Sequence, residues 1–102
     1  MGKLAIQREK DGSTTIFRLD GRLDTNTSLD LQEALEREWE NPTDIILDFE
    51  KLSYMSSAGL RVILSSQKKA TAQNTSFRLI HVSEPVMEVL DVVGFLEFIQ
   101  VN

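Results

Sequence analysis

The chain has no cysteine and a single histidine, His81, among its 102 residues. Disulfides and thiolate metal sites are therefore excluded, and so are metal sites built from clustered histidines. A serine hydrolase is also disfavoured, because no Gly-x-Ser-x-Gly elbow is present and His81 lies in a different predicted element from the serine pair Ser56-Ser57. We interpret His81 as a strand-end residue that faces solvent or a backbone carbonyl. No metal, cofactor or catalytic residue is expected, and no glycine-rich phosphate loop is found.

Long apolar runs and an excess of positive charge are absent as well. No stretch approaches the roughly 18 apolar residues of a membrane span, and residues 1–9 lack the apolar core of a secretory signal. The protein is therefore expected to be cytoplasmic, without a membrane partner. Eleven Lys and Arg against 16 Asp and Glu give a net charge of -5, which disfavours nucleic acid. The expected partner is another protein.

The residues that are present fit one domain, residues 1–102, in which 41% hydrophobic residues supply one modest core. Residues 44–60 are the most informative stretch, since they have the pattern of strand, loop and helix. The unbroken apolar run 45–47 is typical of a central strand covered by helices on both faces. Leu60, Ile63 and Leu64 follow at helical spacing and predict a helix from about residue 57 to 73.

Turn residues and apolar periodicity predict the other elements. Asp11-Gly12 predicts an opening hairpin. Helical spacing predicts a helix carrying Leu31, Leu35 and Trp39 and ended by Asn41-Pro42, and a last helix that Ser83 caps and Gly94 closes. The remaining strands are expected at 4–9, 14–19, 77–82 and, at the sheet edge, within 95–101. This alternation indicates an α/β fold with a mixed, largely parallel sheet of about five strands.

Two polar positions allow both a structural and a functional interpretation. Ser56 and Ser57 are expected at the start of a helix, where backbone N–H groups lack partners and the helix dipole is positive. Such a place favours either a hydroxyl cap or an added anion, so the pair is either a cap with its neighbour or a phosphorylation site. Asp24 either satisfies the turn after Gly21, caps the following helix, or belongs to a binding surface.

The segment Tyr54-Met55-Ser56-Ser57-Ala58-Gly59-Leu60-Arg61 resembles the signature of STAS domains, the family of bacterial anti-sigma factor antagonists. Gly21-Arg22-Leu23-Asp24 resembles the second marker of this family. The spacing of the two motifs and the chain length also fit, so the resemblance covers essentially the whole chain. It implies a small sheet that opens with a hairpin and carries three to four helices chiefly on one face.

The resemblance also implies partner switching. An unphosphorylated antagonist of this family binds an anti-sigma factor that is also a serine kinase, and thereby frees a sigma factor for transcription. Phosphorylation by the kinase releases the antagonist, and a PP2C-type phosphatase restores it. The alternative within the family is a non-switching scaffold subunit, in a stressosome-like assembly or beside a lipid-transport ATPase.

The phosphoacceptor serine of the family matches Ser57. The preceding position, often aspartate in the family, is Ser56 here, which makes Ser56 the second candidate and removes a carboxylate. The residues that the resemblance places on the partner-binding surface are Asp24, Thr25, Asn26, Ser56, Ser57, Ala58 and Gly59.

Overall fold

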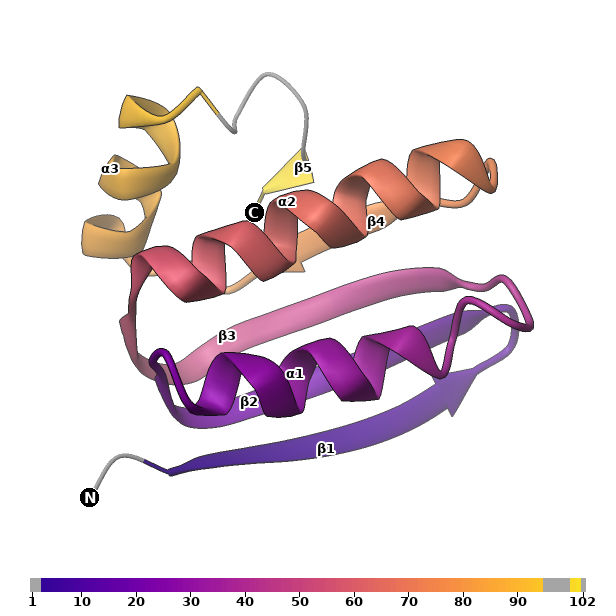
Figure 1. Cartoon of the computed structure of the whole chain (residues 1–102), viewed down its shortest axis with the longest axis horizontal. Helices are drawn as coiled ribbons and strands as arrows, with labels where there is room; N and C mark the ends of the chain where they lie inside the picture. Colours follow the sequence, from indigo (N-terminus) through magenta and orange to yellow (C-terminus); the bar gives the residue numbers. More distant parts are fainter. Residues whose placement is uncertain (1–2, 95–99, 102) are drawn as a thin grey trace.

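A computed structural model describes residues 3–94 and 100–101 of the chain. Strands and helices follow one another in the predicted order (Figure 1). Residues 95–99, which belong to the predicted edge strand, lie outside the described residues, and the strand is seen at 100–101. The elements are β1 (Leu4–Asp11), β2 (Thr14–Leu23), α1 (Thr27–Glu36), β3 (Asp44–Met55), α2 (Ser57–Ala72), β4 (Phe77–Ile80), α3 (Glu84–Val92) and β5 (Gln100–Val101).

The strands form one mixed sheet in the order β1-β2-β3-β4-β5. β1 and β2 are antiparallel, and each later neighbouring pair is parallel. The predicted hairpin is confirmed: Asp11 pairs with Thr14, and Gly12 turns the chain with a φ of 62°, which favours glycine. β3 is central, as its apolar run predicts. The carboxyl ends of β2 and β3 therefore lie at the same edge of the sheet.

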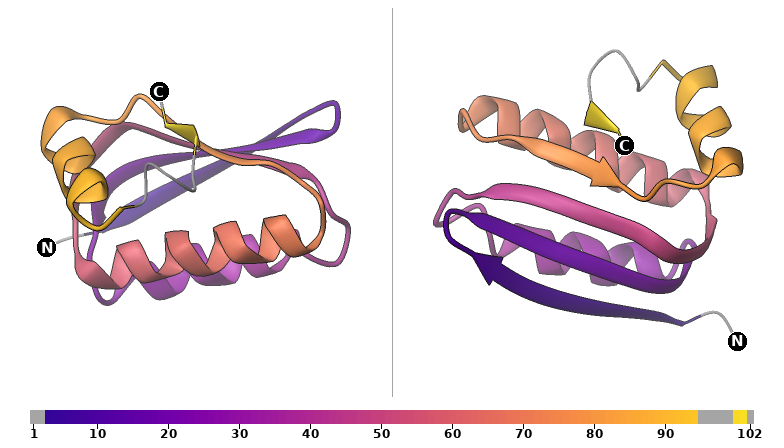
Figure 2. Two further views of the ribbon diagram at one scale, coloured as in Figure 1. Left: turned by 90° about the horizontal axis from the view of Figure 1, so that it is seen from above. Right: turned by 180° about the vertical axis from the view of Figure 1, so that it is seen from behind.

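Helices α1 and α2 lie side by side on one face of the sheet (Figure 2, left). The core is between them and the strands, and Leu31, Leu47 and Ile63 are fully buried in it. The expectation that helices cover β3 on both faces is wrong, because Ile46 points to the other face and is only half-buried. Its apolar character has a different cause: Ile46 pairs in register with Ile16 on β2, and the two side chains are neighbours across the strands.

The first helix ends at Glu36, earlier than the predicted stop at Asn41-Pro42. Glu38 is buried beyond the helix end, where its carboxylate accepts two hydrogen bonds from the Arg8 guanidinium of β1, at 2.8 and 3.0 Å. The carbonyl of Trp39 accepts a hydrogen bond from Nε2 of Gln73 at 2.9 Å, and the Trp39 ring packs half-buried against the core. Because Glu38 and Trp39 make these contacts with distant segments, residues 37–40 do not continue the helix.

β2 continues to Leu23, beyond the expected end at residue 19, and β3 continues to Met55, so the loop expected before α2 is reduced to Ser56. The boundaries of α2, β4 and α3 agree with the sequence to within two residues. β4 ends at Ile80, because His81 adopts a positive φ of 56° that does not continue a strand. Ser83 holds the predicted cap position of α3, but its side chain makes no capping hydrogen bond. Gly94 has a φ of 78°, as expected for the residue that closes a helix. Within residues 3–94 and 100–101, no helix is long and apolar enough to cross a bilayer.

Candidate functional site

The two sequence motifs meet at the carboxyl ends of β2 and β3. Leu23 pairs with Met55, and the N–H of Ser56 donates to the carbonyl of Leu23 at 2.9 Å. Gly59 is buried in the first turn of α2 and packs directly against the Leu23 side chain. A Cβ at position 59 would lie only 2.7 Å from Cδ2 of Leu23. The segments around Leu23 and Gly59 therefore form one structural unit, although they are far apart in the sequence.

Gly21 allows the backbone of the first motif to lie very close to the start of β1. Its φ is +123°, and a Cβ there would lie 2.1 Å from the carbonyl oxygen of Lys3. Because the two backbones are so close, the N–H of Arg22 donates a hydrogen bond to the same Lys3 carbonyl at 3.1 Å. Only glycine provides both the backbone conformation and the space.

The two serines have different environments, which the sequence did not reveal. Ser56 is the N-cap of α2: its backbone is extended, and its half-buried hydroxyl accepts a long hydrogen bond from the N–H of Gly59 at 3.4 Å. Ser57 is the first helical residue and is exposed. Its hydroxyl makes no hydrogen bond within the described part of the chain. Ser57 therefore presents the hydroxyl that is free to react, whereas Ser56 completes the helix start.

Asp24 organises the loop that leads into α1. Its Oδ1 accepts hydrogen bonds from the N–H groups of Asn26, at 3.0 Å, and Thr27, at 2.9 Å, and from the Thr27 hydroxyl at 3.1 Å. The hydrogen bond from the Thr27 backbone is the main reason why the pKa of Asp24 is below its ordinary value; burial opposes this shift. Asp24 therefore stays ionised and satisfies N–H groups that the helix start would leave unpaired.

Asp24 thus caps α1, which is one of the roles expected for it. Asn26 holds the N-cap position, but its side chain makes no capping hydrogen bond. Thr27, whose role was not predicted, is buried, and the carbonyl of Arg22, 2.7 Å from its hydroxyl, is the nearer of two acceptors, with Oδ1 of Asp24, for the single hydroxyl proton. The same hydroxyl oxygen accepts a hydrogen bond from the N–H of Asp24 at 2.8 Å. Thr25 and Asn26 are exposed beside it. Of the residues predicted to contact a partner, only Gly59 is buried, because it packs on Leu23.

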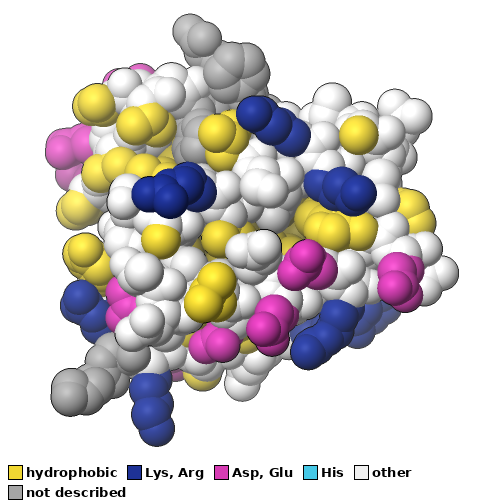
Figure 3. Space-filling view, viewed as in Figure 1, with side chains coloured by type: hydrophobic (Ala, Val, Ile, Leu, Met, Phe, Trp, Pro, Cys, Tyr) yellow, Lys and Arg dark blue, Asp and Glu magenta, His cyan; other side chains and the backbone are white. Residues whose placement is uncertain are grey.

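An open groove of about 1000 Å³ runs between α1 and α2 and reaches this loop. Thr25 and Ala58 line one end of the groove, and the Leu29 side chain, 60% exposed, stands at its rim. The two helices carry opposite charge, since α1 holds three acidic and no basic residues and α2 holds three basic and no acidic residues. Of these, Glu36 of α1 and Arg61, Lys68 and Lys69 of α2 line the groove. Figure 3 shows the basic side chains over α2 and the acidic ones over α1. The groove is therefore lined by apolar and uncharged polar side chains, with three basic residues on the side of α2 and one acidic residue on the side of α1.

Comparison with known protein families identifies the family of this chain. The family model of the STAS domain matches residues 5–102 of the chain. The chain belongs to the STAS domain family. Its curated relatives include the anti-sigma-B factor antagonist of Bacillus subtilis (strain 168), which is 28% identical over 96 residues, covering 94% of this chain and 85% of the relative.

Solved structures give the same result. The anti-sigma factor antagonist SpoIIAA in its unphosphorylated form matches this STAS domain with a TM-score of 0.80 and 25% identity, over 96% of this chain and 87% of that one. The phosphorylated form of the Bacillus cell fate determinant SpoIIAA matches with a TM-score of 0.78 and 24% identity, over 96% of this chain and 91% of that one. The predicted family is confirmed, and so is the general fold.

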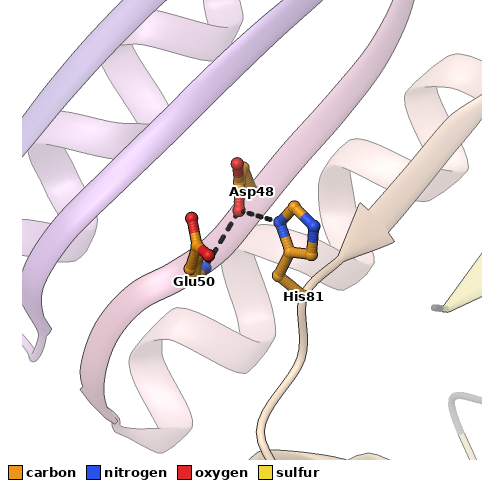
Figure 4. A group of neighbouring side chains, drawn as sticks. All are labelled: Asp48, Glu50 and His81. Carbon is orange, nitrogen blue, oxygen red and sulfur yellow. Dashed lines mark hydrogen bonds and ion pairs between the residues drawn. The ribbon is translucent and has the colours of Figure 1, made fainter.

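The open face of the STAS sheet carries a second polar group, formed by Asp48, Glu50 and His81 (Figure 4). Asp48 is buried, and its Oδ1 accepts from the Glu50 N–H at 3.0 Å and lies 2.8 Å from Nδ1 of His81. His81, expected to face solvent or a backbone carbonyl, is exposed as the first alternative states, but its hydrogen-bond partner is a carboxylate and not a carbonyl. The three side chains are within ligand distance of one cation, since their ligand atoms lie within 4.8 Å of one another. Nε of Arg18, 3.8 Å from Oδ2 of Asp48, already supplies positive charge there.

The pair of Asp48 and His81 makes stability depend on pH. The hydrogen bond and charge of Asp48 raise the pKa of His81 above its ordinary 6.5. For Asp48, burial is the largest single effect and favours the neutral acid, but the Glu50 N–H, His81 and Arg18 together lower its pKa below the ordinary 3.8. The contribution of His81 to the free energy of unfolding is therefore complete below pH 6.5 and is lost as the pH rises through the raised pKa of His81. The contribution of Asp48 is present at neutral pH and is lost as the pH falls through the lowered pKa of Asp48.

We expect the difference in unfolding free energy between the wild-type protein and His81→Asn to be largest near pH 5 to 6 and to shrink towards pH 8 to 9, by the linkage relation. Asparagine tolerates the positive φ of residue 81, so the backbone cost is matched. Urea unfolding followed by circular dichroism at each pH measures the difference. A constant difference across that range would show that protonation of His81 does not strengthen the pair.

Proposed function

We propose that this STAS domain is an anti-sigma factor antagonist that acts by partner switching. The observation that carries the proposal is the exposed Ser57 hydroxyl, which starts α2 without a hydrogen bond in the described chain. In its unphosphorylated form the protein binds an anti-sigma factor that is also a serine kinase, and this frees a sigma factor. Phosphorylation of Ser57 separates the two proteins, and a PP2C-type phosphatase restores the binding form.

The proposed binding surface surrounds Ser57. It consists of Asp24, Thr25 and Asn26 on the loop before α1 and Ser56, Ser57 and Ala58 at the start of α2. Thr25 and Ala58 connect this surface with the groove between the helices. Gly59 supports the surface from below by letting α2 approach Leu23. Binding, and not catalysis, is the proposed activity.

The chemistry of the switch is the transfer of the γ-phosphoryl group of ATP. The Ser57 oxygen forms the new bond to phosphorus, the bond from phosphorus to the ADP oxygen breaks, and the hydroxyl proton goes to a base of the kinase. The phosphatase then hydrolyses the phosphate ester to serine and inorganic phosphate. The reaction needs an accessible hydroxyl, which Ser57 offers more fully than the capping Ser56.

The phosphate is expected to act on the interface and leave the fold intact. It adds about -1.5 to -2 charges at a helix start, where the dipole contributes roughly 0.3 to 1 kcal/mol in favour of an anion. Inside an interface the same dianion must lose water, and a loss of about 1.4 kcal/mol already weakens binding tenfold. The neighbour SpoIIAA, which has been solved in both forms, matches this chain almost equally well in each.

Incubation with candidate anti-sigma factor kinases and ATP tests the proposal. We expect intact-mass spectra to show one added phosphate on the wild-type chain and on Ser56→Ala, and none on Ser57→Ala. If Ser57→Ala still gained a phosphate, Ser56 would have to be assigned as the phosphorylated residue. If no kinase of this class modifies the wild-type chain, the proposal fails and a non-switching scaffold, in a stressosome-like or lipid-transport ATPase complex, becomes the better assignment.

A further inference from the structure

Arg61 lies one helical turn after Ser57 and has no partner in the described part of the chain. It is exposed and lines the groove between α1 and α2. α2 contains no acidic residue that could pair with it along the helix. Three arginines of β1 and β2 are engaged: Arg8 pairs with Glu38, Arg18 pairs with Glu9 and Asp48, and Arg22 stacks on the Tyr54 ring with its guanidinium carbon 4.2 Å from the ring centre. The guanidinium of Arg61 is therefore available for an anion that arrives at the start of α2.

We propose that Arg61 positions the phosphate of phosphorylated Ser57 by pairing with it along the surface of α2. The inference rests on the proposed function, because it assumes that Ser57 carries the phosphate. Side chains at positions i and i+4 of a helix are neighbours, with about 5–6 Å between Cβ atoms, and an anion placed before a cation is the more favourable order. Arginine and phosphate also match geometrically, since the planar guanidinium donates two parallel hydrogen bonds to two phosphate oxygens.

Other basic residues of α2 are too distant for this role. Lys68 is eleven residues beyond Ser57, which at 1.5 Å per residue corresponds to roughly 16 Å along the helix axis. On the opposite side, the loop after β2 carries the ionised Asp24, which would repel a phosphate. The charges of this surface thus favour placing the phosphate along α2, towards Arg61. Pairing there would keep the phosphate dianionic and bound to its own helix.

The test uses protein in which phosphoserine is incorporated at position 57 during translation, so that no kinase is needed. Pairing with Arg61 stabilises the dianion and lowers the second pKa of the phosphate, which 31P NMR measures during a pH titration. We expect this pKa to be roughly 0.2 to 0.4 unit lower in the wild-type background than in Arg61→Gln, given the usual strength of such pairs. Added salt should reduce the difference.

Lys68→Gln is the matched control, because it removes one positive charge from the same helix without changing the i to i+4 pair. Its phosphate pKa should stay close to that of the wild-type background. Equal pKa values in the wild-type background and Arg61→Gln, or an equal shift in Lys68→Gln, would overturn the assignment. Thermal unfolding of each unphosphorylated variant verifies the fold. Since the phosphate is built in, a negative result here leaves the kinase experiment on Ser57 unaffected, and the reverse also holds.

Discussion

Ser57→Asp is expected to weaken binding to the anti-sigma factor by roughly tenfold or more, whereas Ser57→Ala should bind as tightly as the wild-type chain and no longer respond to the kinase with ATP. The carboxylate places a permanent charge at the centre of the proposed surface, and the loss of about 1.4 kcal/mol that this requires is small compared with the cost of desolvating an ion. Alanine removes only an exposed hydroxyl. Isothermal titration calorimetry with the kinase that modifies the wild-type protein measures both affinities.

Ser56→Ala separates the cap from the switch. It removes the hydroxyl that accepts from the Gly59 N–H, so the protein should lose about 1 kcal/mol of stability, as is usual for a lost N-cap. Its affinity for the anti-sigma factor should fall less than that of Ser57→Asp, because the change removes one half-buried hydroxyl of the proposed surface and adds no charge, and the kinase should still release it. Equal binding by Ser57→Asp and Ser57→Ala would place Ser57 outside the interface and remove the basis of the switch.

Local patterns in the sequence predicted much of the site. The start of α2 follows from Ser56-Ser57 ahead of apolar residues at helical spacing, and the opening hairpin follows from Asp11-Gly12. Each depends on residues that are near one another in the chain, where capping and turn geometry decide the conformation. The two family motifs were identified in the same way. Their direct contact through Leu23 and Gly59 could not be predicted from the residues alone, because it depends on the parallel pairing of β2 with β3.

The features that were missed depend on distant parts of the chain. α1 ends early because Glu38 bonds to Arg8, thirty residues away in sequence. His81 finds Asp48, thirty-three residues away, once β4 pairs with β3. Among the described residues, α1 and α2 cover one face of the sheet, although the apolar run through Ile46 suggested helices on both. A cross-strand neighbour can shelter an apolar side chain as well as a helix can. Periodicity reports that a residue is sheltered, but it does not identify which element covers it.

The packing of Leu23 against Gly59 is expected to give the largest stability effects in the site. Leu23 is fully buried, so Leu23→Ala should cost about 2–5 kcal/mol of unfolding free energy. Gly59→Ala should cost about 1–3 kcal/mol, because the new Cβ overlaps the Leu23 side chain and lies tightly against Met55. The sign is informative, since the same change at an exposed helical position would stabilise the protein by up to about 1 kcal/mol. Urea unfolding of the purified variants measures each value.

The double variant Leu23→Ala with Gly59→Ala decides whether the two motifs act as one unit. Removing the Leu23 side chain makes room for the new methyl group, so the combined loss should be smaller than the sum of the single losses by roughly 0.5–3 kcal/mol. Leu35→Ala, near the far end of α1, is the control and should add to Gly59→Ala without coupling (Figure 1). Full additivity for Leu23 would mean that the contact does not constrain α2. If Gly59→Ala couples with Leu23→Ala but not with Leu35→Ala, position 59 requires glycine so that α2 can lie against β2. This packing brings Ser57, at the start of α2, to the same side of the sheet as Asp24, which follows β2.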